Sequence, residues 1–537
     1  MIAPRVSRTH GGMYAPRCMN IRKGFMMNVG DILRFGYRNF PDKECLVCGE
    51  NRFTYAELNR RVNGLAHSLR EMGLRKGDNV AIMLQNCHQY VEIYFALAKI
   101  GSVAVPLNFM LKGNGLEFLA NNSTAGIMFL EEATRSQVEA VRDRLTSMRS
   151  DCFVYVGPDA PAGYLSYEQL VSAGRSDEPG VTVGEDDDLI ILYSSGTTGL
   201  PKGIVLTHKT RLTYYQWCGL EYGMLFDGVH LVTTPMYHNV ACFLSQTQFY
   251  TGGKVVIMRK FDPAACAALI EQEKVTSTFM VPTQLNLMLQ WAEAQSSDLS
   301  SVRTLITGAA PLATRTKEDI IALFNCDLHE MYGLTETGLI TNMKPKDCLR
   351  KTRCVGQPFF HMEMRVVDEG GNDVAAGEVG EIIARGPLLL RTYYRNEESY
   401  RAAIKEGWFC SGDLGRVDGE GFLYLVDRKK DMICSGGVNI YPMDIEEILH
   451  AHPKVLESAV IGIPDDKWGE SVLAVVVLRP GVRMTEQEAI EYCKENMASY
   501  QAPKSVKFVA ALPRNPSGKV LKRELRQPYW EGRESKI

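Results

Sequence analysis

The chain has 537 residues, of which 45% are hydrophobic and 23% are charged, and its formal net charge is −3 at pH 7. This length exceeds what one hydrophobic core can hold, so at least two domains are expected. A charge so close to neutral argues against nucleic-acid binding. No apolar run approaches the length of a membrane-spanning helix, so no integral membrane segment is expected.

The first 30 residues contain arginine and lysine but no acidic residue. Two interpretations are open: a transit peptide, which is basic and poor in acids, or a mobile extension, which we favour over residues 1–19. The stretch has no apolar segment typical of secretion signals. Together with fourteen cysteines at irregular spacings, this favours reduced thiols in the cytoplasm.

Helix and strand patterns alternate through the first 300 residues. Cys45 and Cys48 form a CxxC pair, which favours a strand or hairpin over a metal site because no second pair with zinc spacing follows. A capping box from Thr54 to Glu57 then begins an amphipathic helix. Strands are expected at 80–84, 102–106, 255–258, 278–281 and 302–307, and helices at 89–100 and 262–274. This alternation predicts βαβ units whose parallel sheets are covered on both faces.

The pattern changes twice towards the C-terminus. From about residue 355, glycines punctuate short strands, which predicts a small β-rich subdomain. After Asp427, strands are expected at 457–461 and 472–478 and helices near 443–450 and 486–497. The expected fold class is therefore α/β: a large N-terminal domain over 20–426, built of parallel αβ sheets with a β-rich subdomain, and a small α+β C-terminal domain over 427–537.

The most informative stretch is residues 193–208, YSSGTTGLPKGIVLTH, which follows an apolar strand at 188–192. A strand that leads into glycines, hydroxyl residues and one lysine suits a polyphosphate. Glycine lets backbone N–H groups approach the anion, the hydroxyls donate hydrogen bonds, and Lys202 supplies charge. The loop is not a Walker A motif, since Pro201 precedes the lysine and Gly203 follows it. The alternative is a plain turn between strands.

Further motifs follow in order, and each contains residues suited to a nucleotide. Residues 307–311, TGAAP, place small side chains at the end of a strand, which leaves room for a flat ligand. In YGLTET, Tyr332 offers an aromatic face and Glu336 is a hard oxygen ligand for Mg²⁺. The other motifs are WFCSGDLG at 408–415, DRKKD at 427–431, SGGVN at 435–439 and NPSGKVLKR at 515–523. Taken singly, each would be interpreted as a turn or an exposed charge.

Together these motifs resemble those of the adenylate-forming superfamily, which includes acyl-CoA synthetases, firefly-type luciferases and peptide-synthetase adenylation domains. The resemblance covers about residues 54–525. It implies a site that binds ATP and then AMP. The residues implied at this site are Ser194, Ser195, Gly196, Thr197, Thr198, Gly199, Lys202, Gly308, Ala309, Ala310, Tyr332, Gly333, Thr335, Glu336, Asp413, Arg428 and Lys519.

The resemblance also implies individual roles. Glu336 would hold the magnesium of ATP, Asp413 would accept the ribose hydroxyls, and Lys519 would bridge the carboxylate and the α-phosphate. The C-terminal domain would be mobile and turn about a hinge at Lys430. The residues implied to be catalytic are Lys519, His238, Thr198 and Glu336, and those implied to contact CoA are Ser435, Gly436 and Gly437.

The implied acyl-binding residues are His238, Asn239, Val240, Gly308, Gly333 and Thr337. His238 resembles the aromatic or histidine gate of many acyl-CoA synthetases. No proton transfer is assigned to it, since a carboxylate at neutral pH needs no base. The segments around these residues are mostly apolar or small, which favours a medium-chain, alicyclic or aryl acid over acetate or an amino acid.

The implied reaction is ATP-dependent ligation of a small-molecule carboxylate to CoA through an acyl-AMP, with Mg²⁺ as cofactor and ATP and CoA as co-substrates; a homodimer is left open. The alternatives are an enzyme that loads a carrier protein, a long-chain fatty acid–CoA ligase, a luciferase-like oxidation and an inactive binding module. Residues 238–243 contain no aspartate of the kind that holds an α-amine in peptide synthetases. Intact Lys202, Glu336, Asp413, Arg428 and Lys519 argue against the inactive module.

Overall fold

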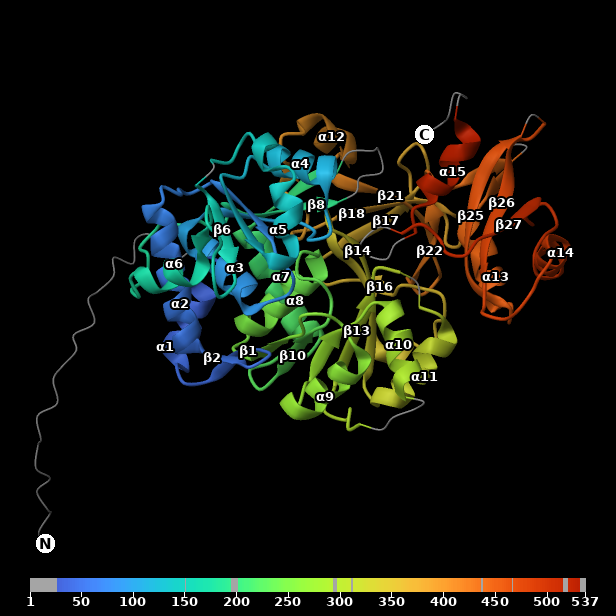
Figure 1. Cartoon of the computed structure of the whole chain (residues 1–537). Helices are drawn as coiled ribbons and strands as arrows, with labels where there is room; N and C mark the ends of the chain where they lie inside the picture. Colours follow the sequence, from blue (N-terminus) through green and yellow to red (C-terminus); the bar gives the residue numbers. More distant parts are fainter. Residues whose placement is uncertain are drawn as a thin grey trace, which may run out of the picture.

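The computed structural model describes residues 27–149, 151–194, 201–292, 297–310, 312–435, 438–465, 467–514 and 520–531. Figure 1 shows a large region, coloured blue to ochre along the chain, and beside it a smaller orange and red region formed by the C-terminal residues. The expected α/β class, with parallel sheets in the large region and a small C-terminal domain, is confirmed. None of the described helices is both long enough and apolar enough to cross a membrane.

The first sheet of the large region has eight strands. Their order is β19 (Thr392–Tyr393), β9 (Lys202–Thr207), β8 (Asp188–Ser194), β4 (Val103–Pro106), β3 (Asn79–Met83), β5 (Ile127–Glu131), β6 (Phe153–Val156) and β7 (Leu165–Ser166). The strands from β8 to β7 are parallel, whereas β9 and β19 are antiparallel additions at one edge. β3 is buried at every position, as expected for a strand covered on both faces.

The second sheet has nine strands. Their order is β16 (Gln357–Pro358), β15 (Gly338–Met343), β14 (Asp327–Leu334), β13 (Thr304–Gly308), β12 (Ser277–Phe279), β10 (Val229–Val232), β11 (Lys254–Ile257), β1 (Glu44–Cys48) and β2 (Asn51–Thr54). The inner strands are parallel, and the antiparallel turn from β14 to β15 carries the predicted YGLTET motif.

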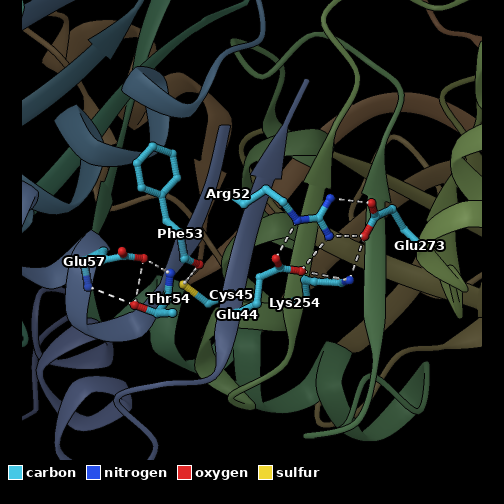
Figure 2. Close-up of polar contacts among 8 residues, drawn as sticks. All are labelled: Glu44, Cys45, Arg52, Phe53, Thr54, Glu57, Lys254 and Glu273. Carbon is cyan, nitrogen blue, oxygen red and sulfur yellow. Dashed lines mark hydrogen bonds and ion pairs between the residues drawn. The ribbon is translucent and has the colours of Figure 1, made fainter. Parts of the chain in front are cut away.

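The β1–β2 hairpin closes one end of this sheet, as the sequence predicted for the CxxC segment (Figure 2). Arg52 of β2 donates hydrogen bonds to Glu44 and to Glu273, and Lys254 of β11 also contacts Glu273 at 2.8 Å. The predicted capping box is confirmed as well, because Thr54 and Glu57 exchange side-chain and backbone hydrogen bonds at the start of the next helix.

Three helices occupy the layer between the two sheets: α3 (His88–Ile100), α7 (His208–Glu221) and α8 (Asn239–Tyr250). α3 contacts β4 and β1, α7 contacts β9, α8 contacts β10, β11 and β12, and α7 packs on α8. The other helices of the large region are α1 (Asp31–Asn39), α2 (Tyr55–Glu71), α4 (Gly113–Asn122), α5 (Glu132–Glu139), α6 (Tyr167–Ala173), α9 (Pro263–Glu273), α10 (Pro282–Ala292), α11 (Thr314–Phe324) and α12 (Glu397–Ala403). Most polar side chains on these three helices are therefore buried, although Lys209 and Gln216 of α7 are exposed.

The predicted β-rich segment forms a third, antiparallel sheet. Its strands are β17 (Glu363–Val367), β18 (Gly380–Arg385), β20 (Ile404–Lys405), β21 (Trp408–Val417) and β22 (Leu423–Arg428). β22 ends at Arg428, two residues before the predicted hinge.

The C-terminal region has its own sheet and its own hydrophobic clusters. The strands are β23 (Ile433–Ser435), β24 (Val438–Ile440), β25 (Val455–Asp465), β26 (Gly469–Leu478) and β27 (Ser505–Phe508), and the helices are α13 (Pro442–Ala451), α14 (Glu486–Asn496) and α15 (Lys522–Trp530). Residues from 433 onwards alone form the two clusters of buried side chains in this region. This separate core is what a domain that moves as a unit requires.

Candidate active site

The strands that flank the predicted phosphate loop are held together, although residues 195–200 lie outside the described residues. β8 ends at Ser194, antiparallel β9 begins at Lys202, and these two residues pair across the ladder. The pairing fixes both ends of the loop at one point of the first sheet. Lys202 Nζ lies 5.1 Å from the centre of the Tyr393 ring, within range of a cation–π contact. The roles of residues 195–199 stay predictions.

Glu336 lies in the turn between β14 and β15, where the second sheet approaches the phosphate loop. The hydroxyls of Tyr393 and Ser194 donate hydrogen bonds to its Oε1 over 3.1 and 3.4 Å. Burial raises the pKa of Glu336, and these hydrogen bonds partly offset that effect. A half-buried carboxylate beside two hydroxyls fits Mg²⁺, which commonly takes one or two carboxylates, water and substrate phosphates.

Asp413, the predicted ribose residue, meets Tyr332 and Arg428, two other predicted nucleotide-binding residues, and the three come from separate strands. The Tyr332 hydroxyl donates a hydrogen bond to Asp413 Oδ2 over 2.8 Å, and Arg428 Nε lies 3.2 Å from Oδ1. Asp413 and Arg428 face each other across the β21–β22 ladder. Burial, followed by the neighbouring Asp413, raises the pKa of Tyr332 well above its ordinary value. Each carboxylate oxygen keeps a further lone pair, with which Asp413 can accept a ribose hydroxyl.

Residues 307–311, predicted to leave room for a flat ligand, begin in the last two residues of β13. Ala309 and Ala310 are exposed, and Ala309 has a φ of +70°. Gly333 is required by packing, because a Cβ there would lie 1.8 Å from the carbonyl oxygen of Gly338 on the neighbouring strand. A bulky residue at 333 would therefore push the two strands apart rather than only reduce the space for an acyl group.

The predicted acyl residues come from three places: His238, Asn239 and Val240 lie at the start of α8, Gly333 and Thr337 lie at the β14–β15 turn, and Gly308 ends β13. His238 precedes α8, its ring centre lies 4.1 Å from that of Tyr237, and its buried Nε2 has no hydrogen-bond partner among the described residues. Burial lowers the pKa of His238 to about 4, so the imidazole is neutral at pH 7. The Thr337 hydroxyl accepts a hydrogen bond from Leu334 N and donates one to Gly338 O, which stabilises the turn.

The predicted hinge at Lys430 lies two residues after the end of β22 at Arg428. Arg526 of α15 donates a hydrogen bond to the Lys430 carbonyl over 3.1 Å and pairs with Asp431. Asp427 accepts a hydrogen bond from Met443 N over 3.0 Å, which connects β22 to the start of α13. Burial raises the pKa of Asp427 to about 6. Ser435 ends β23, while Gly436, Gly437 and Lys519 lie outside the described residues, so their assigned roles stay predictions.

Two residues at the site were missed by the sequence motifs. Tyr393 lies on the two-residue strand β19, and it touches both Lys202 and Glu336. Arg211 of α7 is completely buried between the sheets. In the sequence, the only feature that marks Arg211 is that three aromatic residues, Tyr214, Tyr215 and Trp217, follow it within a few positions.

Comparisons with known proteins agree with this arrangement. Residues 35–394 match the family model described as AMP-binding enzyme, and residues 444–519 match the AMP-binding enzyme C-terminal domain. The long-chain-fatty-acid–CoA ligase FadD13 of Mycobacterium tuberculosis is 36% identical over 94% of this chain and 99% of that protein. A feruloyl-CoA synthase of Amycolatopsis sp is 36% identical over 92% of this chain and 97% of that protein. The solved structure of O-succinylbenzoate coenzyme A synthetase from Bacillus subtilis with ATP and magnesium has a TM-score of 0.82 and 28% identity, and covers 92% of this chain and 99% of that one.

Proposed function

Since this chain belongs to the AMP-binding enzyme family and is an AMP-forming acid–CoA ligase, we propose that it activates a medium-chain, alicyclic or aryl carboxylic acid. One observation carries the choice of acid. The side chains beside the proposed acyl residues are aromatic: the ring centres of Tyr214 and Phe243 lie 4.9 Å apart, and Tyr237 packs on His238. Apolar and aromatic walls suit such acids better than acetate. Of the two relatives described above, one is named for a long-chain fatty acid, which is aliphatic, and the other for feruloyl, which is an aryl acyl group.

In the first half-reaction, a carboxylate oxygen attacks the α-phosphorus of ATP, and the bond to pyrophosphate breaks. Asp413, held by Tyr332 and Arg428, would position the ribose, so that the α-phosphate stays close to the acid. Lys202 would bind phosphate oxygens, and Lys519 would stabilise the charge that develops in the transition state. Glu336 and the hydroxyls beside it would hold Mg²⁺, which when bound neutralises phosphate charge.

In the second half-reaction, the CoA thiolate attacks the acyl carbon, and AMP leaves with the electron pair of the broken C–O bond. Ser435, Gly436 and Gly437 would border the path of pantetheine after the C-terminal domain turns about Lys430. Because Lys519 and this glycine segment serve one site from one domain, the domain would present them in turn.

The test is the measurement of pyrophosphate release and of thioester formation with acids from acetate to long-chain and aryl carboxylates. The proposal expects the highest kcat/KM among medium-chain, alicyclic or aryl acids. A maximum at long-chain acids would favour the long-chain ligase, and adenylation without transfer to CoA would favour carrier-protein loading. A profile that peaks at acetate would contradict the proposal.

The proposed partners of the chain are the carboxylate, ATP and CoA, with Mg²⁺ as cofactor. The proposed location is the cytoplasm. The described cysteines are all free thiols, which agrees with a reducing compartment. A homodimer stays a prediction, and light scattering of the purified protein would measure it.

A further inference from the structure

Arg211 is a charged side chain buried in the large region, and its guanidinium makes no hydrogen bond with any described residue. It lies on α7 and is completely buried. Nε, Nη1 and Nη2 all lack a hydrogen-bond partner within the part of the chain that the structure describes. The titratable groups around it are the phenols of Tyr94, Tyr214 and Tyr215 and the thiol of Cys242, and burial raises the pKa of each, so none supplies a negative charge at pH 7. The hydroxyls of Tyr94 and Tyr215 hydrogen-bond to each other over 3.1 Å, and neither makes a hydrogen bond with the guanidinium.

A continuous set of contacts leads from the proposed acyl residues to Arg211. The Tyr214 ring centre lies 5.7 Å from Arg211 Cζ and 4.9 Å from the ring centre of Phe243 on α8. A Cβ added to Gly338 would lie 1.8 Å from the Tyr214 hydroxyl, so this hydroxyl is beside the β14–β15 turn that carries Thr337. The guanidinium is therefore one side chain away from the turn that the acyl group is proposed to contact.

Other unpaired polar atoms follow the same route. His238 is the N-cap of α8, and Cys242 and Gln246, four and eight residues later, share one face of the helix. Both polar atoms of the Gln246 side chain are buried and without a partner among the described residues. The side chains with such orphan atoms along this route are Tyr90, Arg211, Tyr214, His238, Asn239 and Gln246.

The fold does satisfy a buried cation elsewhere in the same layer. Lys99 of α3 is also buried, and its ammonium donates hydrogen bonds to Asn59, Asn63 and Glu178 over 2.6 to 2.8 Å. A guanidinium stays charged under all ordinary conditions, and a buried charge without a partner strongly destabilises a protein. A cation–π contact with Tyr214 compensates only part of this penalty. A ligand that supplies an anion would complete the site.

We propose that Arg211 binds a second, distal carboxylate of the acid that the enzyme activates, so that the preferred substrates are dicarboxylic acids whose aliphatic or aryl spacer lies along the aromatic wall. The inference rests on the proposed function and narrows its substrate class. A carboxylate accepts two parallel hydrogen bonds from the guanidinium fork, and Gln246 and Tyr214 can donate to the remaining lone pairs.

Arg211 lies on α7, and the residues of the neighbouring helix α8 indicate how far the guanidinium lies from His238. Cys242, which Arg211 approaches, lies one turn beyond His238, and Gln246 lies two turns beyond it. These steps correspond to depths of about 6 and 12 Å along the helix axis. After allowance for a hydrogen bond of about 3 Å, dicarboxylic acids of about four to eight carbons reach the guanidinium from the reacting end.

The decisive measurement is kcat/KM for dicarboxylic acids of four to eight carbons and for monocarboxylic acids of equal length, in the full-length protein. The wild-type enzyme should prefer the best dicarboxylate over its matched monocarboxylate by about 10²-fold, because the monocarboxylate leaves Arg211 unpaired. Arg211→Met should lower kcat/KM for that dicarboxylate by about 10²-fold and leave the monocarboxylate unchanged or improved. Arg211→Lys should retain part of the preference, since it keeps the charge but not the fork.

Lys209→Met is the matched control, because Lys209 lies on the same helix but is exposed and pairs with Glu185. It removes one positive charge and should leave the ratio of dicarboxylate to monocarboxylate activity unchanged. Thermal unfolding gives a readout besides activity. Without an acid, Arg211→Met should unfold at the same or a higher temperature than the wild type. Added dicarboxylate, with a non-hydrolysable ATP analogue present, should stabilise the wild type but not this variant.

Three outcomes would overturn the inference. One is a wild-type enzyme that turns over monocarboxylates at least as well as dicarboxylates of the same length. The second is a loss of kcat/KM in Arg211→Met that is equal for dicarboxylates and monocarboxylates. The third is a lower unfolding temperature of this variant without ligand. Either of the last two would indicate that Arg211 is structural and is hydrogen-bonded by buried water. In these cases the ligase activity remains, whereas failure of the proposed function would appear as activity confined to acetate or to long-chain acids.

Discussion

Asp413 and Arg211 are both charged side chains buried beside the proposed active site, and they differ in how they are paired. Asp413 has Tyr332 on one oxygen and Arg428 on the other before any ligand binds. Arg211 has no hydrogen-bond partner among the described residues. A paired group keeps its geometry without the ligand, whereas an unpaired one destabilises the protein until a ligand arrives. On the proposed assignments, the nucleotide side of the site would be preorganised before ATP binds, and the acyl side would be completed only by an acid that supplies a second carboxylate.

Lys519→Ala should give the largest effect, and it should not depend on the acid. Loss of the ammonium at the α-phosphate should lower acyl-AMP formation by about 10³-fold for every carboxylate. Thioester formation from supplied acyl-AMP and CoA should be spared. Pyrophosphate release and thioester appearance, measured separately, give the two half-reactions.

Lys430→Pro is the counterpart, because it fixes φ at the hinge. It should spare adenylation and depress transfer to CoA. If both variants lose both half-reactions to the same extent, the two steps are not divided between these residues, and the proposed domain alternation is wrong.

Asp413→Ala should act only on the nucleotide side. The change leaves Arg428 and the Tyr332 hydroxyl without their shared partner, so kcat/KM for ATP should fall by about 10²-fold. The KM for the acid should stay within about 2-fold of the wild type, because no acyl residue contacts Asp413 in the described part of the chain. Asp373→Ala, which removes an exposed carboxylate paired with Arg365 in the same subdomain, is the control. An equal change in both KM values would show that the two sides are not independent.

Glu336→Gln tests the magnesium assignment and should lower turnover by about 10-fold at subsaturating Mg²⁺. Burial raises the pKa of Glu336, and only the deprotonated form binds the cation. The wild-type requirement for Mg²⁺ should therefore increase as the pH falls, beginning at a higher pH than for an ordinary glutamate. In the variant this pH dependence should disappear. Magnesium titrations at several pH values measure it, and identical titrations for both proteins would remove Glu336 from the metal site.

His238→Phe should have the smallest effect. Because burial lowers the pKa of His238 to about 4, the imidazole is neutral from pH 6 to 8 and contributes no ionisation there. Adenylation of aryl acids should change by less than about 3-fold, and the pH profile over this range should keep its shape. Loss of an acid limb near pH 6 in the variant would show that His238 titrates during turnover.

The helices and strands that the sequence predicted agree in order and type with the structure, because the signals that predicted them are local. The capping box at Thr54, the alternation that forms the two parallel sheets and the glycine-rich segment that forms the third sheet each depend on a few neighbouring residues. The motifs also named Ser194, Glu336, Tyr332, Asp413 and Arg428, which the structure brings into two hydrogen-bonded groups.

Some features of the site could not be read from local patterns. Tyr393 reaches Glu336 because a two-residue strand pairs with β9, about 190 positions earlier in the chain. Gly333 was assigned to the acyl group, and the structure adds a packing reason for glycine that no single strand reveals. The substitution Gly333→Trp would therefore disturb the β14–β15 pair and would not measure acyl volume.

Lys99 and Arg211 show what the sequence alone cannot predict. In the sequence both are basic residues within largely apolar helical segments, and nothing local distinguishes them. In the fold, residues from α2 and from the loop after α6 reach Lys99 and pair with it. No described residue does this for Arg211. The motifs in the sequence indicated the reaction of the family, and the periodicity of apolar residues indicated helices and strands. Both signals depend only on residues that are close together in the sequence. Tertiary structure alone decided which buried charge is satisfied, because the partners are supplied by distant parts of the chain.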